Sequence, residues 1–136
     1  MRAVSEETRS EIHEILERVS TNVAAAHGAT ATLVIKHGYP VSINDDQIVA
    51  SVVEMAGRVL DPGAVKEMPT PIMGAEDWSY VMQQIPGAMA FLGACPPELD
   101  PGTAPANHSN LVRFDEAAMA KGVALYSGFV LDRLTG

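Results

Sequence analysis

A histidine among short polar side chains is the first feature of this sequence that could do chemistry. His108 stands in Asn107-His108-Ser109-Asn110, after a proline-rich loop and shortly before an apolar helix is expected. Such neighbours can orient one ring nitrogen through a hydrogen bond and leave the other for a metal ion. Spacing alone also fits a surface histidine in a capping loop, which is the simpler interpretation.

Two adjacent carboxylates and one arginine are the other candidates. Glu76 and Asp77 follow a glycine in the stretch MGAEDW. They could bind a metal, support its ligands or act as a general acid and base, although acids are also favoured in a first helical turn. Arg2 could hold a substrate carboxylate through a bidentate pair of hydrogen bonds, although an arginine near a terminus is more often solvated.

Two further histidines and the single cysteine are expected to have structural roles and not catalytic ones. We expect His13 on the surface of a helix and His37 in a loop, and Cys95 as a small apolar residue near the end of a strand. A single cysteine excludes an internal disulfide and a cysteine-rich zinc module.

Composition narrows the class of protein. The chain is 47% apolar and 19% charged, which is typical of a domain that forms a core. Its formal net charge of −8 argues against nucleic acid and anionic membranes as partners. We find no signal peptide and no apolar span of about 20 residues, so we expect a cytoplasmic protein without a membrane helix.

Helices and strands alternate in the predicted order of elements. Ser5 should cap a first amphipathic helix, which Gly28 should end in the left-handed conformation. Asn44 should cap a second helix. The predicted helices run from about Ser5 to Ala26, Asp45 to Leu60, Ala75 to Gln84, and Phe114 to Leu134, the last capped by Asp115.

Strands are predicted between these helices. Alternating residues favour one at Ala29–Lys36, Ala64–Met68 could form a short one, and the apolar run Ala88–Cys95 is typical of a strand buried on both faces. The fold class is therefore α/β. A seam falls at about residues 37–44, and the helix and strand before it are too little to fold alone.

Taken in order, these stretches resemble one enzyme family. The blocks RAVSEETRSEIHEILERVSTNVAAAHGATATL, GYPVSIND, MGAEDWSYVMQQIPGAMAFLG, NHSN and FDEAAMAKGVAL look like the C-terminal part of metal-dependent amidohydrolases of the aminoacylase and carboxypeptidase G type. The resemblance is strongest to the branch of hippurate hydrolase, indole-acetyl-amino-acid hydrolase and N-acyl-amino-acid amidohydrolase. It covers essentially the whole chain.

The resemblance implies a fold and a site. The family has a two-metal exopeptidase-like catalytic domain, with zinc or manganese, and an inserted α+β lid or dimerisation domain. Residues 1–39 would be the last helix and strand of the lid, and residues 40–136 the C-terminal piece of the catalytic domain. His108 matches a metal-ligand histidine and Arg2 the lid arginine that binds the substrate carboxylate. Glu76, Asp77 and Asn107 would be neighbours of the active site.

The same resemblance implies an incomplete site. The family's other metal ligands, its general base and the lid asparagine have no counterpart here, and a catalytic zinc takes about three protein ligands. We therefore expect the chain alone to be inactive on N-acyl amino acids, and to form a homodimer or associate with the missing N-terminal portion. Two alternatives stay open, namely a non-catalytic dimerisation module derived from such an enzyme and a small α/β binding protein.

Overall fold

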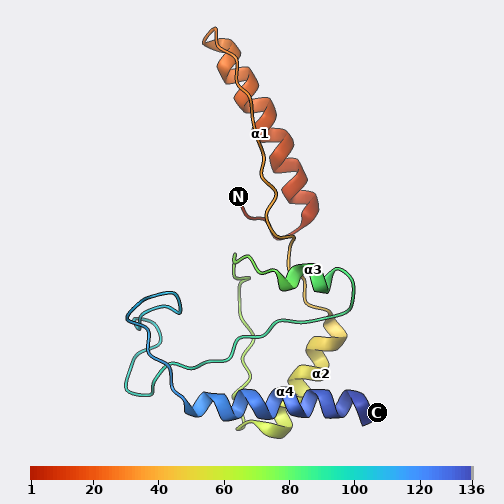
Figure 1. Ribbon diagram of the computed structural model, residues 1–136, viewed down its shortest axis with the longest axis vertical. Helices are drawn as coiled ribbons and strands as arrows, with labels where there is room; N and C mark the ends of the chain where they lie inside the picture. The colour runs from red at the N-terminus through yellow and green to blue at the C-terminus, as the bar shows by residue number, and fades with distance from the viewer. Residues whose placement is uncertain (136) are drawn as a thin grey trace. The chain divides into compact units, whose positions relative to one another are not determined.

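The computed structural model describes residues 1–135 and contains two compact units. Unit 1 comprises Met1–Asn44 and Met68–Gly87, and unit 2 comprises Asp45–Glu67 and the chain from Ala88 onward. The helices in chain order are α1 (Glu6–Ala26), α2 (Asp46–Val59), α3 (Trp78–Met82) and α4 (Ala117–Thr135) (Figure 1).

Helix α1 of unit 1 begins and ends as its sequence predicts. Ser5 is the N-cap, and its side chain accepts a hydrogen bond from the amide of Thr8. At the other end Gly28 has a φ of 68°, and the amide of Ala29 donates to the carbonyl of Ala24 at 2.9 Å. This pairing is the Schellman arrangement, in which a left-handed glycine lets the chain turn back over the last helical carbonyls.

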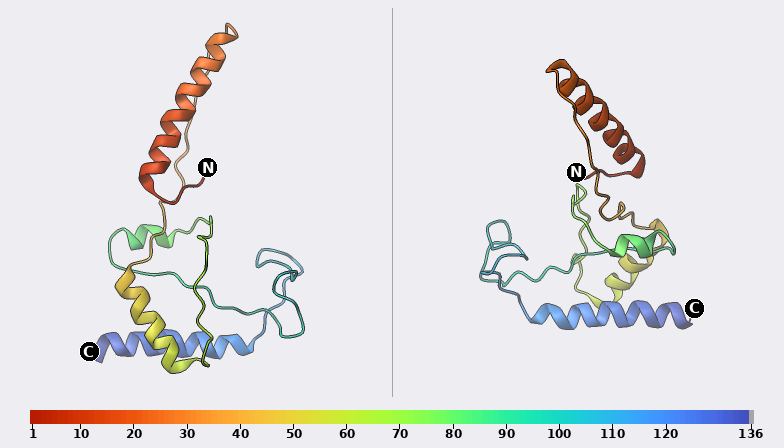
Figure 2. Two further views of the ribbon diagram at one scale, coloured as in Figure 1. Left: turned by 180° about the vertical axis from the view of Figure 1, so that it is seen from behind. Right: turned by 45° about the horizontal axis from the view of Figure 1, so that its top comes forward.

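An extended segment, residues 29–36, runs back alongside α1 in both sets of views (Figures 1 and 2). We predicted a strand here, at Ala64–Met68 and at Ala88–Cys95, but residues 1–135 contain no strand. A strand exists only when successive backbone N–H and C=O groups pair with a neighbouring segment, and no such ladder forms within the described chain. The α/β class is therefore not confirmed by this structure, which is helical.

Helices α2 and α4 pack against each other in unit 2. Met55 and Ala56 of α2 and Ala118 of α4 are buried. Gly128 makes the close approach possible, since a Cβ placed there would lie 2.6 Å from the sulfur of Met55. The two helices are also joined by an ion pair between Arg58 and Asp132 at 3.1 Å.

Three helix boundaries differ from the predictions. The cap of α2 is Asp45 and not Asn44, because the Asp45 carboxylate accepts from the amides of Gln47 and Ile48 at 3.0 Å. Helix α3 is shorter than the predicted range, and Asp77, at its N-cap position, makes no capping hydrogen bond with its side chain. Helix α4 starts at Ala117, whose amide donates to the Asp115 carboxylate.

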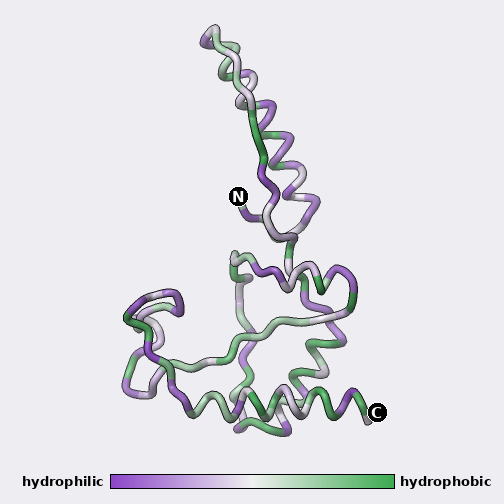
Figure 3. The backbone as a smooth tube through the Cα atoms, viewed as in Figure 1, coloured by the Kyte–Doolittle hydropathy of each residue, from purple (hydrophilic) through white to green (hydrophobic). Residues whose placement is uncertain are grey.

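Hydropathy separates the helices (Figure 3). Helix α4 is coloured as mainly apolar along its length, whereas α1 alternates between hydrophilic and apolar residues. Even so, none of the helices within residues 1–135 is long and apolar enough to span a membrane.

Candidate functional site

Arg2 lies in unit 1, just before α1, and is held by a main-chain acceptor. Its guanidinium donates a hydrogen bond to the carbonyl of Met73. Met73 directly precedes the glycine of the MGAEDW stretch. The predicted carboxylate-binding arginine is therefore connected to the segment that carries Glu76 and Asp77.

Glu76 and Asp77 are both exposed at the start of α3. The main-chain carbonyl of Glu76 accepts from the hydroxyl of Ser79 at 2.6 Å, and Ser79 is completely buried. The turn is thus anchored by Ser79, while Glu76 and Asp77 stay exposed. This arrangement leaves both side chains accessible to a ligand.

His108 and Asn107 lie in unit 2, in an exposed turn. The amide of Ser109 donates to the carbonyl of Ala106 at 2.8 Å, and the Ser109 hydroxyl accepts from the amide of Leu111 at 3.1 Å. Within residues 1–135 the His108 imidazole has no hydrogen-bond partner. One of its ring nitrogens is therefore available to bind a metal ion.

The loop that carries His108 is closed at its base by two contacts. Arg113 pairs with Glu98 at 2.5 Å, and the amide of Asp115 donates to the carbonyl of Ala94 at 2.8 Å. The pKa of Glu98 is lowered, first by a hydrogen bond from its own backbone and then by Arg113. These contacts define where the loop begins and ends, directly before α4.

The predicted site residues are thus divided between the two units. Arg2, Glu76 and Asp77 belong to unit 1, and Asn107 and His108 belong to unit 2. No three His, Cys, Asp or Glu side chains among residues 1–135 gather closely enough to bind a metal together. The described residues therefore do not form a complete site for a catalytic zinc, which takes about three ligands from protein.

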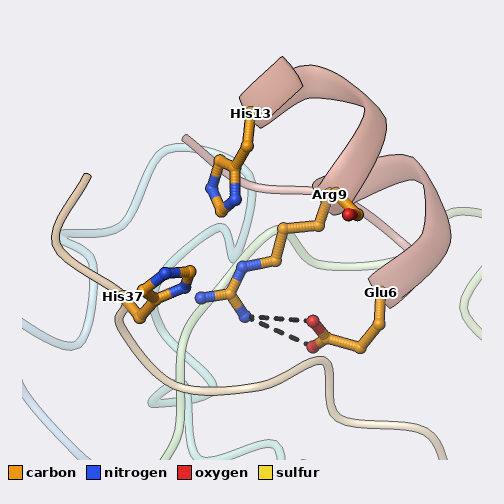
Figure 4. A pocket seen from close by; sticks show the side chains of 5 residues that line it. Glu6, Arg9, His13 and His37 are labelled. Atoms are coloured by element: carbon orange, nitrogen blue, oxygen red, sulfur yellow. Dashed lines mark hydrogen bonds and ion pairs between the residues drawn. The ribbon is translucent and has the colours of Figure 1, made fainter. Parts of the chain in front are cut away.

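Sequence reasoning missed a polar cluster on the first turns of α1 (Figure 4). Glu6 and Arg9 form an ion pair at 3.2 Å, and the Arg9 side chain is only 15% exposed. His13 and His37 line the same small pocket. The spacing of Glu6 and Arg9 could have indicated the ion pair, but their contacts with residues about 30 positions away leave no signal in the local sequence.

Comparison with known proteins gives a consistent set of relatives. Peptidase family M20/M25/M40 matches residues 3–132. Thermostable carboxypeptidase 2 of Saccharolobus solfataricus is 26% identical over 93% of this chain and 31% of its own length. IAA-amino acid hydrolase ILR1-like 4 of Arabidopsis thaliana is 28% identical over 93% of the chain and 29% of its own length.

A third relative extends the match almost to the full chain. N-acetyldiaminopimelate deacetylase of Lactiplantibacillus plantarum is 27% identical over 98% of the chain and 33% of its own length. The chain thus spans about a third of the length of these relatives. No solved structure matches it significantly. Because the family matches nearly every residue of the sequence, the chain belongs to peptidase family M20/M25/M40.

Proposed function

We propose that this chain is the C-terminal part of a metal-dependent amidohydrolase that cleaves the amide bond of N-acyl amino acids in the cytoplasm. The family match over residues 3–132 carries the proposal. Relatives named IAA-amino acid hydrolase and N-acetyldiaminopimelate deacetylase support an N-acyl amino acid as the substrate class.

In the complete enzyme, residues 1–39 would belong to the lid and residues 40–136 to the catalytic domain. The apolar run Ala88–Cys95 would then become a central strand once neighbouring strands supply partners for its backbone. Its composition supports this assignment, because a continuous apolar run suits a strand covered on both faces.

His108 would be a ligand of a zinc or manganese ion that activates water and polarises the scissile carbonyl. Its free imidazole, in a loop closed by Glu98 and Arg113, supports this role. Arg2 would bind the carboxylate of the amino acid, and Glu76, Asp77 and Asn107 would line the site. An arginine suits this task because its planar guanidinium can form two parallel hydrogen bonds to a carboxylate.

Without the remaining ligands and a general base, the chain alone should not turn over substrate. The test is an assay of N-benzoylglycine hydrolysis by the purified chain with added zinc or manganese. Clear turnover that His108→Ala abolishes would overturn the claim of inactivity. Sequencing the reading frame directly upstream tests the larger proposal, which requires a segment with the missing ligands and base.

A dimerisation module is the second candidate, and the surface of α1 favours it. Ile15, Leu16, Val19 and Val23 are between 42% and 55% exposed, so the apolar face of α1 is largely uncovered in the single chain. Burying such a face against a second copy would remove it from water.

Sedimentation velocity over a range of concentrations tests this candidate. A homodimer through α1 should dissociate in Val19→Glu, whereas Thr21→Glu on the same helix serves as the matched control. A monomer at every concentration, or a dimer that Val19→Glu leaves intact, would rule out this surface.

A further inference from the structure

The first turns of α1 hold the connector Gly38–Val41 through one ion pair. The Arg9 guanidinium donates to the carbonyl of Tyr39 at 2.9 Å and to that of Gly38 at 3.4 Å. Its partner Glu6 accepts from the amide of Val41 at 2.7 Å. Arg9 thus binds two carbonyls of the connector, and Glu6 binds one amide. We refer to the pair Glu6–Arg9 as the clip.

The clip is partly withdrawn from water. Figure 4 shows the Arg9 side chain between the Glu6 carboxylate and the rings of His13 and His37. These two rings meet edge to face, with centroids 5.2 Å apart. Hydrogen bonds to charged groups are roughly twice as strong as neutral ones, and limited exposure preserves that strength. The Glu6 side chain is 51% exposed, so this shielding from water applies to the Arg9 end of the clip.

The connector also contacts the helix that follows Glu76 and Asp77. The Tyr39 ring meets the Tyr80 ring of α3 edge to face, with centroids 5.9 Å apart. Ahead of α3, the carbonyl of Met73 accepts from Arg2. All of these residues lie in unit 1.

These contacts form a closed circuit. It runs from Arg2 through Met73 to α3, from Tyr80 to Tyr39, and from the clip back along the first turn of α1. Arg2 takes part in one of these contacts directly, through Met73, and is joined to the first turn of α1 by the chain. Chains of packed side chains and hydrogen bonds can carry energetic coupling between residues, and such coupling is established by a direct test.

We propose that Arg9 is a positioning residue for Arg2. By fixing the connector, Arg9 fixes Tyr39 against Tyr80 of α3, and the short segment 74–77 links α3 to the Met73 carbonyl that accepts from the Arg2 guanidinium. The inference rests on the proposed function only in assigning carboxylate binding to Arg2.

The test uses the full chain and measures two signals by NMR. Exchange of the Val41 amide with solvent reports the clip, and the Nε–Hε resonance of Arg2 reports its orientation. In Arg9→Gln, exchange at Val41 should rise about tenfold, as expected for loss of a charge-assisted network, and the Arg2 resonance should shift. Arg18→Gln, on the same helix, is the control and should change neither signal.

A second variant separates positioning from local stability. Tyr80→Ala breaks the circuit away from the clip, so the Arg2 resonance should shift while Val41 exchange stays unchanged. Tyr126→Ala, an exposed tyrosine of α4, is its control. An Arg2 resonance that neither Arg9→Gln nor Tyr80→Ala moves would overturn the proposal, even if Val41 exchange rises.

Titration with N-acetylglycine distinguishes this proposal from the proposed function. If both hold, the compound shifts the Arg2 resonance, and the shift weakens at least severalfold in Arg9→Gln but recovers in part in Arg9→Lys. The compound could instead leave the Arg2 resonance unchanged while Arg9→Gln and Tyr80→Ala still shift it. In that case Arg9 positions Arg2, but Arg2 does not bind a carboxylate.

Discussion

Helix α1 and the pair α2–α4 begin in the same way but differ in what they bury. Both α1 and α2 start at a side-chain cap, from Ser5 and Asp45 respectively. Yet α1 has no buried residue, whereas Met55 of α2 is only 5% exposed against α4.

This contrast separates two sources of helix stability. Caps, charges near the helix ends and the Schellman turn are local, so they define α1 without any partner. Burial needs a second apolar surface, which α4 provides for α2. Most helical stability in proteins comes from packing, so the two regions should respond differently to the same kind of substitution.

The largest effect is expected from truncating a buried side chain. Met55→Ala should lower the free energy of unfolding by about 2 kcal/mol, because it removes apolar contacts and leaves a cavity. Ile15→Ala on α1 should change it by no more than about 0.5 kcal/mol, since Ile15 is 45% exposed. Urea denaturation followed by circular dichroism measures both. Equal losses would mean that α1 is packed in solution as tightly as α2.

A matched pair of glycine substitutions tests the packing of α2 on α4. Gly128→Ala should destabilise by about 1.5 kcal/mol, because the new methyl group would overlap the Met55 sulfur. Gly57→Ala, where nothing lies within 4 Å, should stabilise by about 0.5–1 kcal/mol through helix propensity. Thermal melts of the two variants give the signs, and a stabilising Gly128→Ala would contradict the close approach.

Removing the cap of α1 should cost less. Ser5→Ala loses the hydrogen bond from the Thr8 amide at 3.1 Å and should destabilise the helix by about 1 kcal/mol. Amide exchange in the first turn of α1 should accelerate about fivefold, the factor that such a loss implies. Ser10→Ala on the same helix is the control. Equal effects of the two variants would show that the Ser5 cap does not stabilise α1.

The smallest effect concerns the exposed ion pair of Asp61 and Lys121 in unit 2. A hydrogen bond and the charge of Lys121 lower the pKa of Asp61, and the same contacts raise the pKa of Lys121. The lowered Asp61 pKa gives stability that is lost as pH falls through its folded value. The raised Lys121 pKa gives stability that is lost as pH rises through its folded value.

The pair should therefore contribute only between those two limits. In Asp61→Asn the melting temperature should decline less steeply on acidification than in the native sequence, and added salt should reduce the difference. Identical pH profiles would show that this pair adds nothing to unit 2.

Local signals in the sequence predicted the helices, whereas the predicted strands are not confirmed by this structure. Ser5 and Gly28 gave the bounds of α1 because caps act on neighbouring residues. Asp45, adjacent to the expected Asn44, competes for the same cap, and its carboxylate is the stronger acceptor at a helix N-terminus. The run Ala88–Cys95 has strand composition, but a strand also requires a partner that composition cannot supply.

The site was predictable only in part, because contacts between residues far apart in the sequence leave no local signal. The sequence placed His108 in a loop before an apolar helix, and the structure agrees. Its role as a metal ligand, and that of Arg2 as a carboxylate clamp, stay predictions. The contacts of Arg9 with Gly38 and Tyr39 could not be predicted, because they depend on how the chain returns after α1.

The extended segment after α1 has a consequence for how the chain behaves when it is made alone. Thr30–Ile35, with the sequence TATLVI, is uncharged, free of proline and rich in β-branched residues, and its backbone is not paired within residues 1–135. Short segments of this kind stack between molecules into cross-β fibrils. Lys36 is the charge that directly flanks the segment, so replacing it would remove a gatekeeper against aggregation.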